Sequence, residues 1–363
     1  MAKKKPHKIT TTVKAFVDAL NSTYVAKKST VPILTYARVK DGTMTDLDIA
    51  TIVPFEAKGS GDFVIPHKTV LNALKGEKGP VTLEYLEDTS KGTDDVSRSV
   101  SVTCGEIAFQ FPTLSVANYP QTPEPSAATL TIDGKTMATL IDRSLFAILH
   151  EESRYTINGM LIKSENGTVT TAATDGHRLA YNLAAGNGSL EETIVLRRAM
   201  EWVRRNCGGD VGIGKDNDTQ TFHTKTCTIL SRKLTGQFPN FEAVMPRDNK
   251  IRLSFDSSTQ FANTMKRVAK CSDERSGAVT ISVLSDAVVL SAQSTEHGSA
   301  KASVACKVGG PVSPMKISFN YEYFIDFLVA IGEKPFTLAL KDSQAAGELS
   351  VDGFRYVVMP MRI

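Results

Sequence analysis

The sequence predicts an α+β fold made of three similar domains, each with two helices packed on antiparallel sheets. The chain has 363 residues, which is too long for one ordinary core and suggests two or three domains. Short extended segments that lead into a helical pattern begin at Ile9, Leu130 and Ile251. Both spacings, 130 − 9 and 251 − 130, are 121 residues, one third of the chain. An internal repeat of this length predicts three copies of one unit.

The first helix of each repeat is expected directly after the extended segment, where apolar residues recur at helical period. The apolar stripes comprise Val13, Phe16, Val17 and Leu20; Met137, Leu140, Ile141, Leu145 and Ile148; and Phe261, Met265 and Val268. Asp133 and Asp256 precede the second and third stripes, and we expect them to act as N-caps.

A second helix is expected later in each repeat, between a short strand and a glycine. The strands lie around Ile65, Leu196 and Phe319, and the glycines are Gly79, Gly209 and Gly332. Glycine is favoured just beyond a helix C-terminus. Further strand patterns follow at 81–83, 211–213 and 336–338. Each third therefore combines two helices with many β-branched, alternating strands, as an α+β domain does.

Two linkers suggest where the domains meet. The segment 118–126 holds three prolines, and 246–250 is polar. We expect an N-terminal domain over 1–122, a central domain over 127–249 and a C-terminal domain over 250–363.

Composition is that of a soluble globular protein, with 41% hydrophobic and 22% charged residues. No apolar run approaches the roughly 20 residues of a membrane helix, and no apolar segment follows the basic N-terminus as in a signal peptide. The five cysteines form no CxxC pair, which argues against disulfides and a thiolate zinc site. A cytoplasmic protein with reduced cysteines is expected. A net charge of +3 does not indicate a partner by itself.

Enzyme and metal motifs are weak. The near-match to a phosphate-binding loop at 209–215 has Asp216 where a magnesium-binding Ser or Thr is required. The six histidines form no HExxH motif, and no GxSxG motif occurs. We predict no catalytic residue, no metal and no cofactor. An enzyme that uses His150, Asp175 and His177 remains an alternative, and it predicts that the reaction rate collapses on His177→Ala.

One segment is more specific than the rest: Ala173-Thr174-Asp175-Gly176-His177-Arg178-Leu179-Ala180. The pattern predicts a strand over 170–174, a tight Asp175-Gly176 turn and a second strand from His177. A plain hairpin explains Asp175 and Gly176 but not the His177-Arg178 pair beside them.

This string resembles the most characteristic motif of the bacterial DNA polymerase III beta subunit family, the β sliding clamps. The closing residues 356–363, the Gly236-x-Phe238-Pro239-x-Phe241 segment and the Val31-Pro32-Ile33-Leu34 string are also similar to motifs of that family. The resemblance covers the whole chain. It implies a head-to-tail homodimer that forms a ring of six domains around duplex DNA. It also implies a non-enzymatic processivity factor for DNA polymerase III, loaded by an ATP-driven clamp loader.

A sliding ring requires phosphate contacts that are independent of DNA sequence. Four arginines form a band on the helix expected around 197–205, with Glu201 as the opposing charge. The predicted DNA-binding residues are Lys27, Lys28, Lys68, Lys75, His150, Arg154, Tyr155, Arg197, Arg198, Arg204, Arg205, Lys266 and Lys270. For any single lysine, a solvated helix face is the better interpretation.

The family also binds short motifs of polymerases, the clamp loader and repair proteins in an apolar pocket between the second and third domains. The matching residues are Ile157, Thr174, Gly176, His177, Arg178, Leu179, Pro239, Val244, Val357, Val358, Met359, Pro360, Met361 and Arg362. Methionines suit a site that adapts to several partners. From the residues alone, an ordinary last core strand is the better interpretation of Val357 to Met361, and the resemblance reverses that order.

The resemblance places the dimer interface at Phe109, Phe111, Lys270 and Cys271. Lys270-Cys271 stand where an apolar pair would pack, and Ala243 stands where the family often has a basic residue. A lysine would weaken an apolar interface unless a carboxylate pairs with it. The alternative function is therefore a divergent clamp that serves a plasmid, phage or repair polymerase, or a monomeric adaptor.

Overall fold

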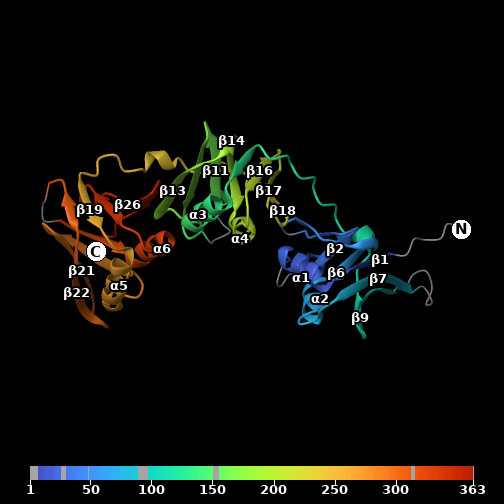
Figure 1. Ribbon diagram of the computed structural model, residues 1–363. Coiled ribbons are helices and arrows are strands. Elements are labelled where there is room, and N and C mark those ends of the chain that lie inside the picture. The colour runs from blue at the N-terminus through green and yellow to red at the C-terminus, as the bar shows by residue number, and fades with distance from the viewer. Residues whose placement is uncertain are drawn as a thin grey trace. The chain divides into compact units, whose positions relative to one another are not determined.

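The computed structural model describes residues 7–25, 30–47, 49–88, 97–149, 155–311 and 315–362 (Figure 1). The helices in these ranges are α1 (Val13–Ser22), α2 (His67–Ala73), α3 (Gly134–Leu145), α4 (Arg197–Asn206), α5 (Ser258–Val268) and α6 (Tyr321–Ile331). Each third of the chain thus holds two helices, as the repeat predicts. None of these helices is long and apolar enough to cross a membrane.

The strands of the first third are β1 (Lys8–Thr12), β2 (Tyr36–Lys40), β3 (Thr43–Thr45), β4 (Thr51–Pro54), β5 (Lys58–Ser60), β6 (Asp62–Pro66), β7 (Pro80–Asp88), β8 (Ser97–Cys104) and β9 (Ile107–Pro112). Those of the middle third are β10 (Leu130–Ile132), β11 (Gly159–Glu165), β12 (Thr168–Thr174), β13 (Arg178–Ala185), β14 (Asn187–Gly188), β15 (Leu190–Leu196), β16 (Val211–Lys215), β17 (Thr219–His223) and β18 (Thr228–Arg232).

The last third contains β19 (Ile251–Phe255), β20 (Ala278–Val283), β21 (Ala287–Ser294), β22 (Gly298–Ala305), β23 (Lys307–Gly309), β24 (Met315–Asn320), β25 (Phe336–Leu340), β26 (Gly347–Val351) and β27 (Phe354–Val358). Short 3₁₀ turns are η1 (Pro32–Thr35), η2 (Val116–Asn118), η3 (Tyr155–Ile157), η4 (Phe241–Ala243) and η5 (Ala269–Cys271).

The chain packs into two compact units. The first comprises Met1–Lys135 and Trp202–Lys233, and the second comprises Thr136–Glu201 and Leu234–Ile363. The middle third is divided between them, because one of its sheets continues into strands of the first third and the other into strands of the last third.

In the first unit, one sheet has the order β5-β1-β7-β8-β9, and another runs β10-β16-β17-β18-β4-β3-β2-β6. The second of these joins two repeats, because β18 pairs antiparallel with β4 through Thr228–Ile52 and Ile229–Thr51. Strands of the first and middle thirds therefore share one hydrogen-bonded sheet.

In the second unit, a nine-stranded sheet has the order β15-β11-β12-β13-β27-β26-β25-β19-β23, beside a four-stranded sheet β22-β21-β20-β24. Here β13 pairs antiparallel with β27, from Arg178–Val358 to Asn182–Phe354. Strands nine apart in chain order occupy equivalent positions, so that β4, β13 and β22 correspond, as do β9, β18 and β27.

The helices bury the stripes that the sequence predicts, with two corrections. Val13, Phe16 and Leu20 of α1 are buried, whereas Val17 and Leu145 are only half-buried. The N-cap of α5 is Ser257, not Asp256. The Ser257 hydroxyl accepts a hydrogen bond from the Gln260 backbone N–H at 3.1 Å, because one extra residue separates β19 from this helix.

Candidate functional site

The hairpin of β12 and β13 is wider than the sequence predicts. Thr174 pairs with Leu179, so residues 175–178 form a four-residue connection instead of a two-residue turn. The Asp175 carboxylate organises it by accepting the backbone N–H groups of His177 at 3.0 Å and Arg178 at 3.1 Å. Gly176 has a φ of +93°, a left-handed conformation that glycine adopts without a Cβ penalty.

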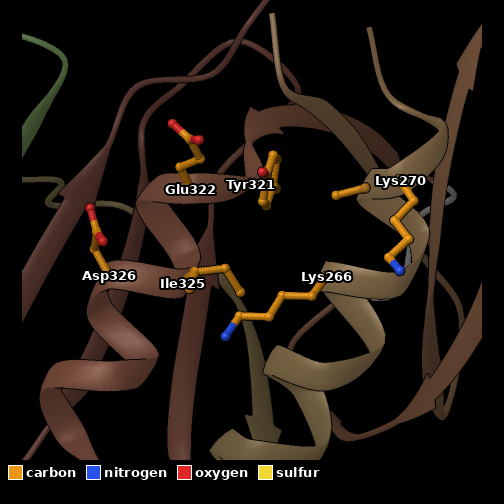
Figure 2. A pocket seen from close by; sticks show the side chains of 7 residues that line it. Lys266, Lys270, Tyr321, Glu322, Ile325 and Asp326 are labelled. Carbon is orange, nitrogen blue, oxygen red and sulfur yellow. The ribbon is translucent and has the colours of Figure 1, made fainter. Parts of the chain in front are cut away.

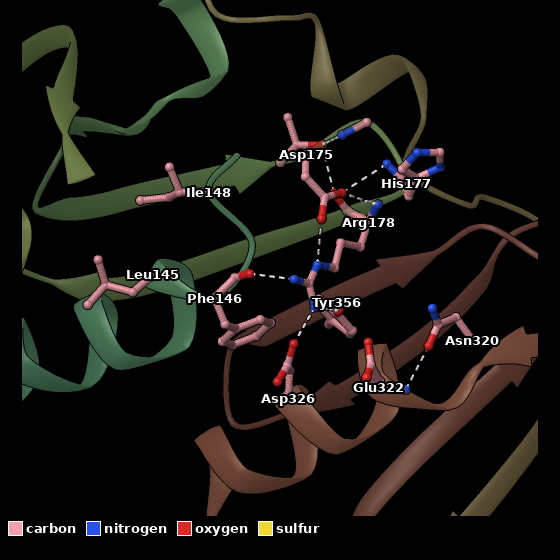
Figure 3. Close-up of polar contacts among 12 residues, drawn as sticks. Leu145, Phe146, Ile148, Asp175, His177, Arg178, Asn320, Glu322, Asp326 and Tyr356 are labelled. Atoms are coloured by element: carbon pink, nitrogen blue, oxygen red, sulfur yellow. Dashed lines mark hydrogen bonds and ion pairs between the residues drawn. The ribbon is translucent and has the colours of Figure 1, made fainter. Parts of the chain in front are cut away.

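Arg178 ties this connection to distant parts of the same unit (Figure 3). Its guanidinium donates to Asp175 Oδ2 at 2.8 Å, to Asp326 Oδ2 of α6 at 2.5 Å and to the Phe146 carbonyl at 2.6 Å. The same group lies over the Tyr323 ring, 4.5 Å from its centroid. Only 12% of the side chain is exposed. Arg178 therefore has a structural role that a simple hairpin does not require.

The network keeps Arg178 charged. Burial alone would lower the pKa of its guanidinium, but the charge interaction with Tyr356, the hydrogen bond to Asp326 and the charge of Asp175 outweigh burial and raise that pKa. Burial also raises the pKa of the Tyr356 phenol. The group that joins β13 to α6 is thus a permanent cation beside the Tyr356 hydroxyl and two carboxylates.

The C-terminal strand is anchored beside the hairpin. After β27, the Met359 N–H donates to the His177 carbonyl at 3.0 Å, and the Met361 N–H donates to the Ser318 carbonyl at 2.7 Å. The ring of His177 is exposed, as are the side chains of Met359 and Arg362. Backbone hydrogen bonds therefore hold the hairpin connection and the C-terminal segment together. The two are far apart in the sequence: Arg178 and Tyr356 are separated by 178 positions.

An apolar cluster lies on one face of this sheet. It comprises Leu161, Ala172, Leu179, Ile194, Phe238, Phe241 and Val357, with Tyr181, Leu234, Met245 and Ala346 packed against it. The Phe241 ring lies 5.5 Å from that of Tyr181 and 6.1 Å from that of Phe238, centroid to centroid. Pro239, Val244 and Met359 are exposed, and the exposed fraction of Val244 is 57%.

Strand alternation separates the predicted partner-binding residues into two groups, because successive side chains point to opposite faces. Leu179 and Val357 pair in register and belong to the apolar cluster. Arg178 and Val358 also pair in register, so they lie on the opposite face, where Arg178 meets α6. Ile157 is buried, and Thr174, Pro360 and Met361 are half-buried. Gly176 is exposed in the connection.

Of the cluster, only Leu179 and Val357 are among the predicted site residues. Tyr181 follows Leu179 by two residues, so alternation along the strand could have identified it. Phe238 and Phe241 belong to the 236–241 segment, which the sequence singles out for its resemblance but from which Pro239 alone was predicted as a site residue. Lys163 was also missed, and its ammonium lies 5.9 Å from the Phe241 ring centroid.

The arginine band of α4 is not uniform. The Arg197 Nε donates to Glu201 at 3.0 Å, and its Nη1 donates to the carbonyls of Leu145 at 2.5 Å and Ile148 at 3.4 Å. Arg197 therefore satisfies the carbonyl of Leu145 at the C-terminal end of α3 and that of Ile148 just beyond it. Arg198, Arg204 and Arg205 are exposed.

The remaining predicted DNA-binding lysines are exposed where they are described: Lys68, Lys75, Lys266 and Lys270. Lys27, Lys28, His150 and Arg154 lie outside the described residues. Tyr155 begins η3, and only its backbone is described. Across the described ranges, no group of three or more His, Cys, Asp or Glu side chains could hold a metal ion.

The predicted dimer residues lie at two sheet edges or beside them. Phe109 and Phe111 on β9 are half-exposed, and their rings stack with centroids 5.9 Å apart. Lys270 is exposed and Cys271 half-buried, both in η5.

Comparison with known proteins identifies the family. Two domain models of the DNA polymerase III beta subunit match this chain, that of the C-terminal domain over residues 242–362 and that of the central domain over residues 131–240. The chain belongs to the DNA polymerase III beta subunit family. The beta sliding clamp of Pseudomonas aeruginosa is 28% identical over 358 residues, 93% of this chain and 95% of that protein. The beta sliding clamp of Chlamydia pneumoniae is 26% identical over 355 residues, 93% of this chain and 94% of that protein.

Solved structures of beta sliding clamps share the fold. A crystal structure of the Caulobacter crescentus clamp has a TM-score of 0.87 at 26% identity and covers 99% of this chain and 100% of that one. A Pseudomonas aeruginosa clamp structure has a TM-score of 0.87 at 24% identity with the same coverage. The chain is thus a DNA sliding clamp of α+β fold, a non-catalytic processivity factor.

Proposed function

We propose that two copies of this sliding clamp join head to tail into a closed ring around duplex DNA. The ring tethers DNA polymerase III, through its alpha subunit, and other clamp-binding proteins by short peptide segments that dock at the apolar cluster. Each copy contributes three domains, 1–122, 127–249 and 250–363. A clamp loader built from other chains opens the ring, and no cofactor is needed by the clamp itself. The cytoplasm, where bacterial DNA is replicated, is the compartment that this function requires.

The observation that carries the ring is the set of sheet edges. Two of the three equivalent edge pairs are joined within the chain, β4 with β18 and β13 with β27. Among the described strands, β22 and β9 are the equivalents that end their sheets without a further partner. An unpaired edge presents free N–H and C=O groups to another strand. Pairing β22 of one copy with β9 of the other would form a third edge pair of the same kind as β4–β18 and β13–β27. Two such pairs, with each copy supplying both of its edges, close a ring of two copies.

The distribution of cations supports sequence-independent DNA contacts. Three arginine side chains of α4 are exposed, those of Arg198, Arg204 and Arg205. Exposed lysines also lie on or near helices of the first and last thirds, at Lys68, Lys75 and Lys266. Phosphate contacts position a protein without reading bases, as a sliding ring requires. On α6, Asp326 is neutralised by Arg178, which reduces the repulsion that its charge would exert on DNA. The topology of the ring would provide most of the retention.

The apolar cluster supports peptide docking. The half-buried Tyr181 packs against the buried rings of Phe238 and Phe241. Val244, whose backbone N–H donates to the Phe241 carbonyl, and Met359, two residues after Val357, are exposed. Aromatic and leucine anchors gain most where they fill such a surface, and methionine adapts to anchors of different shape. Thr174, His177 and Arg362 add polar groups at the rim.

The test is binding of a fluorescent Gln-x-x-Leu-Phe-type peptide, with a scrambled peptide as control and native mass measured on the same sample. We expect micromolar, sequence-dependent binding to a dimer. Val244→Glu should weaken binding at least tenfold, because it places a charge at the apolar surface. Leu284→Glu is the matched control, since Leu284 is 46% exposed away from the cluster, and it should change the affinity less than twofold.

Either part of the proposal can fail separately. A dimer that does not distinguish the peptide from its scrambled form would contradict the docking site and leave the ring. A chain that stays monomeric at all accessible concentrations would contradict the ring.

A further inference from the structure

In each third of the chain, a row of side chains crosses the four neighbouring strands that lead to β9, β18 or β27. Registered pairs define the rows Leu253-Leu338-Leu349-Tyr356, Leu130-Ile213-Phe222-Ile229 and Ile9-Leu83-Val102-Phe109. Every member is buried except Phe109, which is half-exposed. Phe109 therefore ends a row of core residues but is itself only partly covered by other side chains.

The equivalent residue in the last third shows what covers such a position. Tyr356 pairs across the joint with Ala180 of β13, and its ring lies 5.4 Å from the Phe146 ring at an interplanar angle of 66°. Phe146 directly follows α3. Where β13 and β27 pair, the residue after the first helix of the middle repeat, Phe146, thus packs against Tyr356, which ends the core row of the last repeat.

Lys270 occupies the place of Phe146 in the last third. The turn after α3 is closed by the Ile148 N–H, which donates to the Leu145 carbonyl at 3.3 Å. The turn after α5 is closed in the same way by the Ser272 N–H, which donates to the Ala269 carbonyl at 2.9 Å. The residue after Leu145 is Phe146, and the residue after Ala269 is Lys270.

The surroundings of Lys270 are open to a second copy. Its side chain borders two hollows of about 520 and 350 Å³. Figure 2 shows Lys270 on the segment that follows α5, with Lys266 on α5 itself and Tyr321 on α6. The β22 edge packs against both α5 and η5, so a strand added to β22 runs close to Lys270. Lys270 forms none of the ion pairs found among the described residues.

We propose that in the ring the Lys270 ammonium of one copy lies on the Phe109 ring of the other, a cation–π contact in place of the Phe146–Tyr356 ring pair. The inference rests on the proposed head-to-tail ring and specifies its interface. An ammonium over a phenyl face is attracted by the ring quadrupole, more strongly when water is excluded. The contact requires no carboxylate to pair with the lysine. A lysine at this position therefore does not destabilise an interface that is otherwise apolar.

The test is the dimer dissociation constant of the full-length chain, measured by sedimentation at several concentrations. Lys270→Gln removes the charge, and Phe109→Leu removes the ring but keeps an apolar side chain. Because a closed ring contains two such interfaces, each substitution should raise the dissociation constant at least fivefold. Adding Lys270→Gln to Phe109→Leu should change it less than twofold further, because the partner ring is already absent.

Two further variants complete the experiment. Lys270→Arg keeps a cation and should restore the dissociation constant to within about threefold of the original. Lys266→Gln is the matched control, an exposed lysine one turn earlier on α5 that borders the same hollow, and it should have less than a twofold effect. Circular dichroism verifies that each variant is folded.

The outcomes separate this contact from the ring itself. A stable dimer whose dissociation constant is unchanged or lowered by Lys270→Gln would overturn the contact alone. Equal effects of Lys270→Gln with and without Phe109 would do the same. If Lys270→Gln weakens DNA binding and leaves the dimer unchanged, Lys270 binds phosphate instead. A monomeric unsubstituted chain would overturn the ring.

Discussion

Arg178 bonds to a residue 148 positions away, because its guanidinium reaches Asp326 on α6 as well as Asp175 in the hairpin connection. A guanidinium offers five donors in a fixed planar geometry, so it can satisfy two carboxylates and a carbonyl at once. The hairpin connection also holds the Met359 N–H through the His177 carbonyl. The shape of the candidate peptide site therefore depends on a side chain that lies on the other face of the sheet.

Arg178→Ala should lower the free energy of unfolding by about 3 kcal/mol, because it leaves Asp175 without its ion pair in a mostly buried position. Arg178→Lys should recover only part of this loss. Urea unfolding measures both. Arg355→Ala provides the control, since the Arg355–Glu348 pair is also bidentate but Arg355 is 39% exposed, and its loss should cost about 1 kcal/mol or less. Equal losses for Arg178→Ala and Arg355→Ala would contradict the role of Arg178.

His67 makes stability depend on pH. It is 9% exposed, and its Nε2 lies 2.8 Å from the Leu20 carbonyl. Burial lowers the pKa of the imidazole, although the contact with Leu20 raises it. The folded state thus binds the proton less readily than the unfolded state does. The stabilising contribution is present above the unfolded pKa of about 6.5 and is lost as pH falls below that value.

When the pH falls from 7 to 5, the free energy of unfolding of the unsubstituted chain should therefore decrease by about 1 kcal/mol more than that of the His67→Gln variant. The glutamine amide of this variant can still donate to the Leu20 carbonyl. Urea midpoints at the two pH values give the difference. Other titrating groups affect both proteins, so the comparison isolates His67. The same acid dependence in both would show that His67 does not contribute.

At the scale of elements, α4 combines two functions on one short helix. Arg197 at its start caps α3, while Arg198, Arg204 and Arg205 remain exposed. Trp202 on the same helix is buried and donates through its indole N–H to the Ser22 carbonyl at 3.3 Å. Arg205 also lies over the Trp202 ring, 5.3 Å from its centroid.

The triple substitution Arg198→Glu, Arg204→Glu and Arg205→Glu should weaken DNA binding and reduce the slope of log affinity against log salt concentration, since each phosphate contact contributes about one unit to that slope. Peptide binding should be unchanged. Lys40→Glu, Lys58→Glu and Lys225→Glu form a charge-matched control on exposed residues outside α4. If that control weakens DNA binding as much, net charge rather than α4 is responsible.

At the scale of the whole molecule, the order of strands within the chain implies how two chains join. The edges β4, β13 and β22 are equivalent, and so are β9, β18 and β27, but each joint takes one edge from each set. A symmetric pairing of β22 with β22 would need two edges of the same set. The interface is therefore expected to be heterologous.

This expectation can be tested by mixing two variants. Phe109→Asp with Phe111→Asp blocks β9, and Ala300→Asp with Ala302→Asp blocks β22 on the face that carries Val304. Each variant alone should be monomeric, whereas an equimolar mixture should form a dimer with one intact interface, weaker than the original. Native mass with one isotopically labelled chain distinguishes the species. A β9 variant that dimerises alone would exclude the head-to-tail arrangement.

Much of the fold is accessible from the sequence because its signals are local. The period of 121 residues and the apolar stripes at Phe16, Ile141 and Met265 identify the repeats and the buried faces of their helices. The Asp175-Gly176 string identifies a hairpin, and the closing Tyr356 to Met361 segment identifies a partner for it by resemblance. The N-cap of α5 was assigned one residue too early, because a single inserted residue before the helix leaves no periodic signal.

The sequence by itself determined the three repeats, their α+β content and the family. Only the tertiary structure decided which edges pair, that Arg178 and Val358 turn away from the cluster around Phe241, and that Arg197 caps a helix. These properties depend on strand register and on contacts between residues more than 50 positions apart. Helical period and strand alternation arise from neighbouring residues, so they can be seen in the sequence, whereas register between distant strands is fixed only when the whole sheet assembles.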